Sequence, residues 1–317
     1  MKLFEGIITP VITPFHRDES QSVNEKALAD QIEWLIGQGV QGIFVLGSNG
    51  EFHVLDHDEK VAVTRCAVKA AAGRVPVYAG AGACSTKEAI ALAKDMEAAG
   101  ADALSVVNPW FLPPADQDLY GHFKAVSEST SLPVILYNIP KATGKALSPR
   151  LVDKLADLPG IAAIKDSSGD PELLKAYADI ASRKDFRLLV GSDSKITLAY
   201  DLGASGAVAG TSNLIPDILV ELDKALRTGD RERAVKLQEA IEPLRAVLPL
   251  GTVPSVLKKA VELNGTCQAG PARWPVQELD REAVRRVQTM VEGYRSRGYA
   301  GAADTDSTDR EKKEAAL

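Results

Sequence analysis

The sequence predicts an α/β fold, a (β/α)8 TIM barrel with a C-terminal helical extension. Three observations lead to this prediction. Eight short runs rich in β-forming residues alternate with amphipathic stretches of helical periodicity. Several helical stretches end in a glycine directly before the next strand. The chain of 317 residues is 45% hydrophobic, so it can bury a large core, and its part after residue 214 has only helical patterns.

The eight predicted strands occupy short apolar runs that are bounded by turn residues. They span residues 6–15, 42–50, 75–83, 103–109, 132–140, 160–169, 187–194 and 203–213. Eight strand–helix units within roughly 210 residues are typical of a closed parallel barrel. A doubly wound sheet is the structural alternative. Its dinucleotide-binding version requires GxGxxG, and the stretch YAGAGACS lacks the last glycine.

The helices between these strands are predicted from periodicity and from their end signals. In NEKALADQIEWLIGQG, the side chains of Leu28, Ile32 and Leu35 fall on one helical face. In STKEAIALAKDMEAAG, Ser85 is placed as the N-cap and Glu88 as the second member of a capping box. Four helical stretches end in glycines that suit a left-handed C′ position, namely Gly39, Gly100, Gly160 and Gly203.

The chain divides into three predicted regions. The TIM barrel covers residues 1–225, and a C-terminal helical region follows at 226–298. The stretch PDILVELDKALRTG supplies the eighth barrel helix, and further amphipathic stretches follow it. The last residues, 299–317, are polar and lack a hydrophobic face, so we expect a disordered tail there.

The composition excludes several classes of partner. The formal net charge is −6 and no block of basic residues occurs, which argues against binding to nucleic acid. No apolar run is long enough to cross a membrane, and MKLFEGIITP does not have the pattern of a signal peptide. Cys66, Cys84 and Cys267 are widely spaced and form no CxxC, which suits a reducing cytosol. We therefore expect a cytoplasmic protein with neither a disulfide framework nor a zinc site.

Lys165 directly follows the apolar run 161–164 in GIAAIKDSSGD. Two interpretations are open. Either the strand ends and the ammonium group reaches water, or the lysine is buried and its lowered pKa makes it a nucleophile for carbonyl carbons. Because side chains alternate along a strand, Ile161, Ala163 and Lys165 are expected on one face. If that face is the barrel interior, Lys165 lies at the C-terminal mouth, where barrel active sites are found.

Other predicted strands end in polar groups at the same level. Ser48 and Asn49 follow the second strand, Tyr137 ends the fifth, and Asp193 follows the seventh. Tyr137 and Lys165 end neighbouring strands, so the phenol is placed to relay a proton during carbinolamine formation; core packing is the alternative role. The Ser48 hydroxyl and the nearby amides suit a carboxylate, although a glycine-flanked polar segment is more often only a turn.

Metal-dependent and serine-hydrolase chemistry have little support in the sequence. His53 and His57 stand four residues apart, but the glutamate of HExxH is absent. Asp56 and Glu59 fit a helix capping box, so both histidines are expected at the surface. No GxSxG is present to build a hydrolase nucleophile. We therefore expect a reaction that needs no metal and no dissociable cofactor.

Taken together, GSNGEF, YNIP followed by TG, IKDSSGD, GSD and GAVAGTSN resemble the dihydrodipicolinate synthase/N-acetylneuraminate lyase family. The resemblance covers about residues 5–295. It implies a TIM barrel with a C-terminal helical region, assembled as a homotetramer that is a dimer of dimers. It also implies that Lys165 forms a Schiff base with pyruvate or another 2-keto acid, and that an aldehyde is the second substrate.

The resemblance assigns a role to each matching residue. Tyr137 is the proton relay, and Ser48 and Asn49 bind the carboxylate of the keto acid. Gly191 and Val208 shape the pocket from the seventh and eighth strands. For a polyhydroxy aldehyde, Thr143, Asp193 and Ser194 are placed to meet the hydroxyl groups, although Thr143 also suits a turn and the other two also suit a helix cap.

Two departures from the family pattern concern the acceptor aldehyde. Dihydrodipicolinate synthases carry an arginine two residues after the YNxP proline, and here that position is Ala142. They also carry a tyrosine, contributed across a subunit interface, where this chain has Phe111. YNIPKATGK, LGSNGEF and VVNPWF look more like the branch that cleaves 2-keto-3-deoxy sugar acids. We therefore expect a class I carbon–carbon lyase that reversibly cleaves such an acid to pyruvate and an aldehyde.

Three alternatives remain open. The first is a 4-hydroxy-tetrahydrodipicolinate synthase, which condenses pyruvate with aspartate semialdehyde and would need another cation, such as Lys141 or Lys145. The second is a dehydratase for a keto-deoxy acid, since the same imine acidifies the adjacent C–H bond. The third is a barrel that binds a keto acid as a sensor without catalysis, which the presence of Lys165 and Tyr137 argues against.

Overall fold

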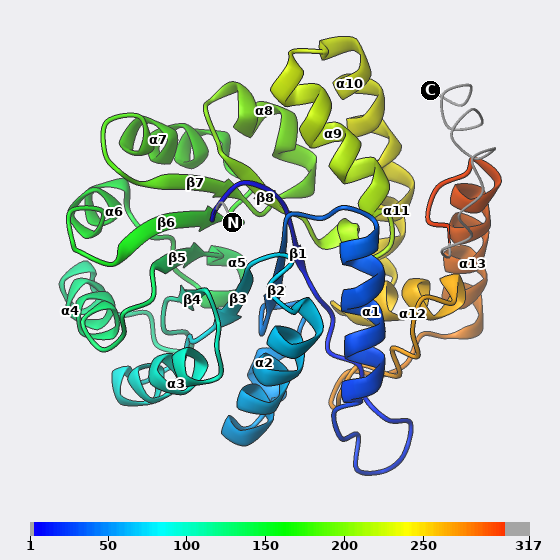
Figure 1. The fold of residues 1–317 in the computed structure, drawn as a ribbon, viewed down its shortest axis with the longest axis horizontal. Helices are drawn as coiled ribbons and strands as arrows, with labels where there is room; N and C mark the ends of the chain where they lie inside the picture. The colour runs from blue at the N-terminus through cyan, green and yellow to red at the C-terminus, as the bar shows by residue number, and fades with distance from the viewer. Residues whose placement is uncertain (1–2, 302–317) are drawn as a thin grey trace.

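The computed structural model describes residues 3–301 as a closed barrel of eight parallel strands surrounded by helices (Figure 1). Each strand pairs with the next along the chain, and β1 pairs with β8 to close the barrel. The strands are β1 (Gly6–Pro10), β2 (Gly42–Val45), β3 (Val77–Gly80), β4 (Ala103–Val107), β5 (Val134–Asn138), β6 (Ile161–Asp166), β7 (Arg187–Val190) and β8 (Gly206–Val208). The predicted TIM barrel is confirmed.

The helices alternate with the strands and form the outer layer in Figure 1. Those of the barrel are α1 (Glu25–Gly37), α2 (His57–Ala71), α3 (Thr86–Ala98), α4 (Asp116–Ser127), α5 (Pro140–Thr143), α6 (Pro149–Leu155), α7 (Pro171–Ala181), α8 (Ile196–Asp201) and α9 (Pro216–Thr228). Within the described residues, the C-terminal region contains α10 (Arg231–Ala240), α11 (Glu242–Val247), α12 (Ser255–Asn264) and α13 (Arg281–Ser296).

The barrel has an inner core that is separate from the core under the helices. Each strand contributes one side chain to the inner core: Ile8, Phe44, Tyr78, Ala103, Ile135, Ala163, Leu189 and Val208. The larger outer core packs the strands against the helices, and it includes Leu28, Ile32 and Leu35, as the periodicity of α1 predicts. An interior filled with side chains and an outer ring of packed helices are what a TIM barrel requires.

The predicted alternation along β6 is wrong at its first residue. Ile161 packs in the outer core, whereas Ala163 belongs to the inner core. The reason is a register shift in β6, since Val134 pairs with Ile161 but the next residue, Ile135, pairs with Ala163. A bulge inserts one extra residue into the strand, so the side chains before it point to the opposite face from the one that strict alternation predicts. Lys165, which lies after the shift, keeps the predicted inward direction.

The helix-end predictions are confirmed at the glycines and only half confirmed at Ser85. The four glycines predicted at C′ all have a positive φ, between 87° and 96°. Ser85 accepts a hydrogen bond from the Glu88 amide. The Glu88 carboxylate does not complete the box, because its Oε1 contacts His57 Nδ1 at 3.0 Å instead. Asp56 and Glu59 form the capping box that the sequence predicts for α2.

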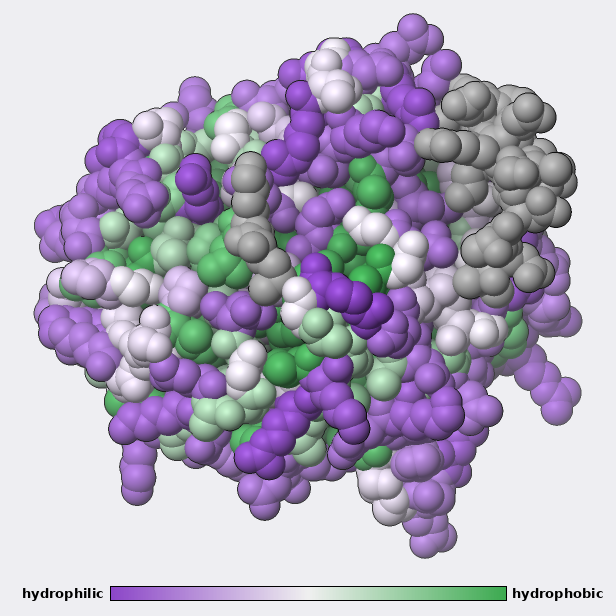
Figure 2. All heavy atoms as spheres, viewed as in Figure 1, coloured by the Kyte–Doolittle hydropathy of each residue, from purple (hydrophilic) through white to green (hydrophobic). Residues whose placement is uncertain are grey.

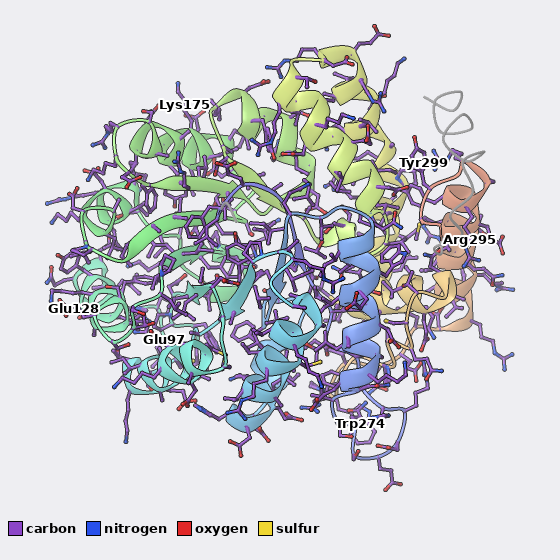
Figure 3. The ribbon with its side chains drawn as sticks, in the orientation of Figure 1. Glu97, Glu128, Lys175, Trp274, Arg295 and Tyr299 are labelled. Atoms are coloured by element: carbon purple, nitrogen blue, oxygen red, sulfur yellow. The ribbon has the colours of Figure 1, made fainter. Side chains whose placement is uncertain are left out.

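The C-terminal helical region packs along one side of the barrel in Figure 1. It continues past the predicted boundary at 298, because Tyr299 and Ala300 are buried and the Asn264 side chain donates a hydrogen bond to the Ala300 carbonyl. Figure 3 shows Tyr299 beside α13. The remainder of the predicted tail, 302–317, lies outside the described residues.

The surface in Figure 2 is mostly hydrophilic over the outer helices, with apolar side chains gathered between them towards the barrel axis. Within residues 3–301, none of the helices has the length and apolar character that a membrane span requires.

Candidate active site

Lys165 lies inside the mouth of the barrel, with 4% of its surface exposed. Its amine sits over two aromatic rings, 3.8 Å from the centroid of Tyr137 and 4.6 Å from that of Phe44. Burial lowers the pKa of the Lys165 amine, while Tyr137 and Asp193 act in the opposite direction. Of the two interpretations of this lysine, the structure shows the buried one.

Tyr137 is the direct strand neighbour of Lys165 in the β5–β6 pair. Its side chain is buried, and its hydroxyl lies 3.3 Å from Ser48 Oγ. The turn after β2 therefore meets the end of β5 at the cavity that Lys165 also lines. This places a phenolic hydroxyl, a second hydroxyl and a desolvated amine around one cavity, the arrangement that general acid–base assistance of an amine attack requires.

The strand ends that carry these groups are fixed to each other by Asn138 and Asp166. Asn138 Nδ2 donates to Asp166 Oδ1 at 2.7 Å, and Asn138 Oδ1 accepts from the Leu147 amide. The Ser168 hydroxyl and amide also donate to the Asp166 carboxylate. Burial raises the pKa of Asp166, although these donors act against that shift. The sequence analysis assigned no role to either residue, and their only signal is that they directly follow Tyr137 and Lys165 at the strand ends.

Gly191 leaves the space that Lys165 occupies. A Cβ at this position would lie 3.1 Å from Lys165 Cε and would collide with the Ser167 hydroxyl. A second close approach occurs at Gly210, where a Cβ would lie 2.9 Å from Asn49 Nδ2. A side chain at either position would therefore displace a site residue, Lys165 or Ser167 at 191 and Asn49 at 210.

Seven of the eight predicted site residues line one cavity of about 440 Å³ at the C-terminal ends of the strands. They are Ser48, Asn49, Tyr137, Lys165, Gly191, Asp193 and Val208. The cavity is covered by residues of the helical region, including Val256 and Leu257 of α12. A concave, mostly apolar cavity with few converging polar groups is typical of a small-molecule site.

Thr143 lines a neighbouring cavity of about 280 Å³. Its hydroxyl donates to the carbonyls of Ile139 and Lys145, as in a turn. This cavity also contains Ala142, Phe52 and Trp110, and the last two rings are in edge contact with centroids 5.5 Å apart. The substrate-binding role of Thr143 stays a prediction.

Asp193 joins the loops that follow β7 and β8. Its carboxylate accepts from the amides of Gly210 and Thr211, at 3.2 and 2.8 Å. Desolvation raises the pKa of this carboxyl, and the amide donors act against the shift. Both oxygens are therefore already engaged by backbone, so the predicted contact with a substrate hydroxyl stays a prediction. Ser194, beside it, is exposed.

Two further cations line the same cavity, Lys141 after β5 and Arg245 on α11. Lys145, the other lysine considered from the sequence, instead bonds to Asp116 and to the Pro114 carbonyl. Arg245 Nη1 lies 2.6 Å from Glu242 Oε1 and one third of the side chain is exposed. Reasoning from strand ends could not find Arg245, because it comes from the helical region.

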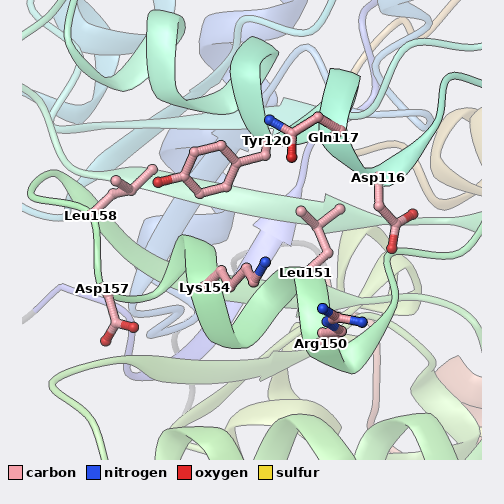
Figure 4. Close-up of a pocket in the computed structure, with 8 residues that line it drawn as sticks. All are labelled: Asp116, Gln117, Tyr120, Arg150, Leu151, Lys154, Asp157 and Leu158. Carbon is pink, nitrogen blue, oxygen red and sulfur yellow. The ribbon is translucent and has the colours of Figure 1, made fainter.

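A cavity of about 520 Å³ lies elsewhere, on the outer surface between α4 and α6 (Figure 4). Tyr120, Lys154 and Arg150 line it, and none of the predicted site residues does. Its two acidic groups are paired with lysines, Asp116 with Lys145 and Asp157 with Lys184. The predicted site residues therefore gather at the barrel mouth and not at this outer cavity.

Within residues 3–301, no three or more His, Cys, Asp or Glu side chains are grouped so that they could hold a metal ion. His53 is exposed, and His57 bonds to Glu88 and Asp95, which raise its pKa. His57 therefore joins α2 to α3 in an ion-pair role.

A closed β/α barrel with a desolvated lysine beside a tyrosine at its mouth suits covalent catalysis at a carbonyl carbon, the chemistry of a carbon–carbon lyase. The chain belongs to the dihydrodipicolinate synthetase family, whose sequence model matches residues 3–293. The resemblance inferred from the motifs is thereby confirmed.

Similar proteins cover nearly the whole chain. A 4-hydroxy-tetrahydrodipicolinate synthase of Methanoculleus marisnigri is 37% identical over 91% of this chain and 99% of its own. The crystal structure of a dihydrodipicolinate synthase from Bacillus anthracis is 32% identical, covers 92% of this chain and 99% of its own, and has a TM-score of 0.87. The structure of YagE, a prophage protein of this family from E. coli K12 in complex with pyruvate, is 33% identical, with the same coverage and a TM-score of 0.88.

Proposed function

We propose that this protein is a pyruvate-dependent class I lyase in which Lys165 forms a Schiff base. The observation that carries the proposal is the buried Lys165 amine, 3.8 Å from the ring centroid of its strand neighbour Tyr137, inside a cavity of about 440 Å³. A solved relative, YagE, is in complex with pyruvate. The same cavity offers the Ser48 hydroxyl and the Asn49 amide as partners for a keto-acid carboxylate.

In the proposed reaction, the neutral Lys165 amine attacks the C2 carbonyl of pyruvate and forms a carbinolamine. Tyr137 passes a proton to the departing hydroxyl, which leaves as water, and an imine remains. Loss of a C3 proton gives an enamine, and its C3 carbon bonds to the carbonyl carbon of an aldehyde. Hydrolysis of the imine then returns the lysine. The reverse order cleaves the same bond.

The first test is reduction of the protein with borohydride in the presence of pyruvate. We expect a covalent adduct at Lys165, located by peptide mass mapping, and the same yield after treatment with EDTA, because an imine replaces a Lewis acid. Absence of an adduct, or a yield that depends on the metal content, would contradict the proposal.

The acceptor is proposed to be an aldehyde that carries a carboxylate, with aspartate semialdehyde as the first candidate. The sequence analysis favoured a sugar-acid aldolase, but the names of the relatives favour the alternative, a 4-hydroxy-tetrahydrodipicolinate synthase. The cations Arg245 and Lys141 support this choice, since they line the cavity around Lys165, whereas the position of the missing arginine, Ala142, lies in the neighbouring cavity. A guanidinium binds a carboxylate through paired, charge-assisted hydrogen bonds.

Cleavage of a 2-keto-3-deoxy sugar acid remains the second candidate. It is favoured by Ala142 and Phe52 in the neighbouring cavity, where no cation is present among the lining residues. A neutral polyhydroxy aldehyde needs only hydroxyl and amide partners, such as Thr143 or Ser48. Dehydration of a keto-deoxy acid would follow from the same imine, and product analysis separates it from aldol cleavage.

Measuring both acceptors on one preparation distinguishes these candidates. We expect kcat/KM for aspartate semialdehyde to exceed that for glyceraldehyde by at least about tenfold, which corresponds to about 1.4 kcal/mol in transition-state binding. We expect Arg245→Met to lower the value for the semialdehyde by about tenfold or more, because a charge-assisted hydrogen bond is lost. Glyceraldehyde should be nearly unaffected by this change. A preference for glyceraldehyde in the unmodified protein would instead establish the sugar-acid reaction.

Assembly as a homotetramer, a dimer of dimers, is also proposed. Phe111 and the adjacent Leu112 are 87% and 75% exposed, which is unusual for large apolar side chains. We expect light scattering to give about four times the chain mass of 33.8 kDa, and Phe111→Asp to reduce it. The control Val235→Asp changes another exposed apolar side chain and should leave the mass unchanged. A monomeric unmodified protein would contradict the proposal.

A further inference from the structure

A buried ion pair connects the turn after β2 with the C-terminal helical region. Lys258 on α12 lies 2.8 Å from Glu51 Oε1, and the two side chains are only 1% and 2% exposed. Glu51 comes two residues after Asn49, in the turn that lines the catalytic cavity. The two partners are 207 positions apart in the chain, so the pair forms only when the helical region is docked.

Further hydrogen bonds to the pair also come from the helical region. Lys258 Nζ donates to the Pro271 carbonyl at 2.6 Å, and the Arg273 amide donates to Glu51 Oε2 at 2.8 Å. The Lys258 amine and the Arg273 guanidinium lie 4.1 and 4.3 Å from the centroid of the Phe15 ring. Both oxygens of Glu51 are therefore held by groups that lie outside the barrel.

Arg273 binds the segment that follows the turn. Its two terminal nitrogens lie 2.6 and 2.7 Å from the Glu59 carboxylate, and one of them also donates to the Val54 carbonyl at 3.0 Å. Its segment continues to Trp274, whose amide donates to Gln21 Oε1 at 2.9 Å; Figure 3 shows Trp274 close to the end of α1. The segment from Glu51 to the first turn of α2 is thus held at Glu51, Val54 and Glu59.

The turn itself needs such support. Glu51 has a φ of 55°, a left-handed conformation that is unfavourable for a residue other than glycine and persists only where the surroundings determine it. Two buried charges are costly to desolvate unless they are paired and hydrogen-bonded. Burial lowers the pKa of Lys258 to about 8, while Glu51 acts in the opposite direction. An apolar pair would fill the same space without the desolvation free energy of two charges, but it would not orient the turn.

We propose that the Glu51–Lys258 pair is a positioning device, through which the C-terminal helical region fixes the Ser48–Asn49 turn for the carboxylate of the keto acid. Neither residue lines the cavity, so both act through the turn. The same helix α12 also covers the cavity with Val256 and Leu257. Docking of the helical region therefore closes the site and sets its affinity for the keto acid. This inference rests on the proposed pyruvate chemistry.

The test is Lys258→Met, with kinetics measured for both substrates. We expect the pyruvate constant, which is the pyruvate concentration at half-maximal turnover or half-maximal borohydride trapping, to rise by at least about tenfold. A small displacement of a binding group has an effect of this order. The KM of the acceptor and kcat should stay within about threefold, because Lys165 and Tyr137 are untouched. An unchanged pyruvate constant, or an equal loss for both substrates, would overturn the proposal.

Arg17→Met is the matched control. Arg17 also joins the barrel to the helical region, through Glu262 and Glu278 at 2.8 and 2.9 Å, but it does not contact the Glu51 turn. Arg17→Met should leave the pyruvate constant unchanged. A rise equal to that in Lys258→Met would show that any weakening of the contact between barrel and helical region has this effect, and would overturn the specific role of the Glu51–Lys258 pair. If Lys258→Met does not fold, Glu51→Gln/Lys258→Met removes both charges, and a normal pyruvate constant in that variant would refute the proposal.

Hydrogen exchange of the turn gives a readout that is independent of catalysis. In Lys258→Met, the amides of residues 47–51 should exchange at least about tenfold faster, because the turn opens more often. Exchange that is unchanged would overturn the positioning role. If the unmodified protein forms no pyruvate adduct, the proposed function fails, and the exchange result still decides whether the pair holds the turn.

Discussion

Lys165→Ala is expected to abolish both the pyruvate adduct and turnover, with kcat falling by at least about 10⁴-fold, the order that removal of a catalytic nucleophile produces. In the proposed reaction, the Lys165 amine is the only protein group that bonds covalently to the keto acid. Its removal leaves a small space lined by Phe44 and Tyr137. Water entering that space does not form an imine, so no partial rescue is expected.

Lys141→Ala is the control for this variant, since Lys141 lines the same cavity. It should retain the adduct at Lys165 and most of the turnover with glyceraldehyde. An adduct on a different lysine, or substantial activity in Lys165→Ala, would show that Lys165 is not the nucleophile.

The pH dependence of the unmodified protein gives an independent check on the same residue. Burial lowers the pKa of Lys165 from its usual value near 10.5. The neutral amine is the nucleophile, so kcat/KM for pyruvate should fall as the pH drops through this lowered pKa. The acid limb of the profile is therefore expected well below 10.5, and a limb at the value of an exposed lysine would contradict a desolvated nucleophile.

The barrel and the centre of the site could be predicted because they depend on local sequence patterns. A short continuous apolar run that ends in a polar residue places that residue at a strand end. In a parallel barrel all strand ends meet at one mouth, which brings Lys165, Tyr137 and Ser48 together without knowledge of any long-range contact. The prediction failed at Ile161, because a bulge in β6 is a packing adjustment that the run GIAAIK does not reveal.

The parts that could not be predicted all depend on contacts between distant segments. In the sequence, Lys258 has the pattern of an ordinary charged residue on a helix. Its burial against Glu51 follows only from the docking of α12 on the barrel. Arg245 enters the cavity for the same reason. Glu88 fits a capping box by spacing, but the imidazole of His57 on the preceding helix competes for its carboxylate. Local signals identify possible partners, and tertiary packing decides between them.

Tyr137→Phe is expected to lower kcat by roughly 10²–10⁴-fold, the usual range for removal of a general acid–base group. The variant keeps the ring whose centroid lies 3.8 Å from the Lys165 amine and loses only the hydroxyl that approaches Ser48 Oγ at 3.3 Å. Packing around the nucleophile therefore stays the same. Binding of the keto acid should weaken much less than kcat, because Ser48 and Asn49 are retained.

Tyr177→Phe separates this effect from the loss of a buried hydroxyl in general. Tyr177 is also fully buried, and its hydroxyl donates to the Leu147 carbonyl away from the cavity. It should cost about 0.5–1.5 kcal/mol of stability, the net value of an ordinary hydrogen bond, and leave kcat nearly unchanged. If Tyr137→Phe behaves like this control, with lower stability and normal turnover, then Tyr137 is a packing residue and the proton that leaves with water comes from another group. If instead kcat falls while the melting temperature stays constant, the hydroxyl acts on the reacting atoms, because a structural role would have changed stability first.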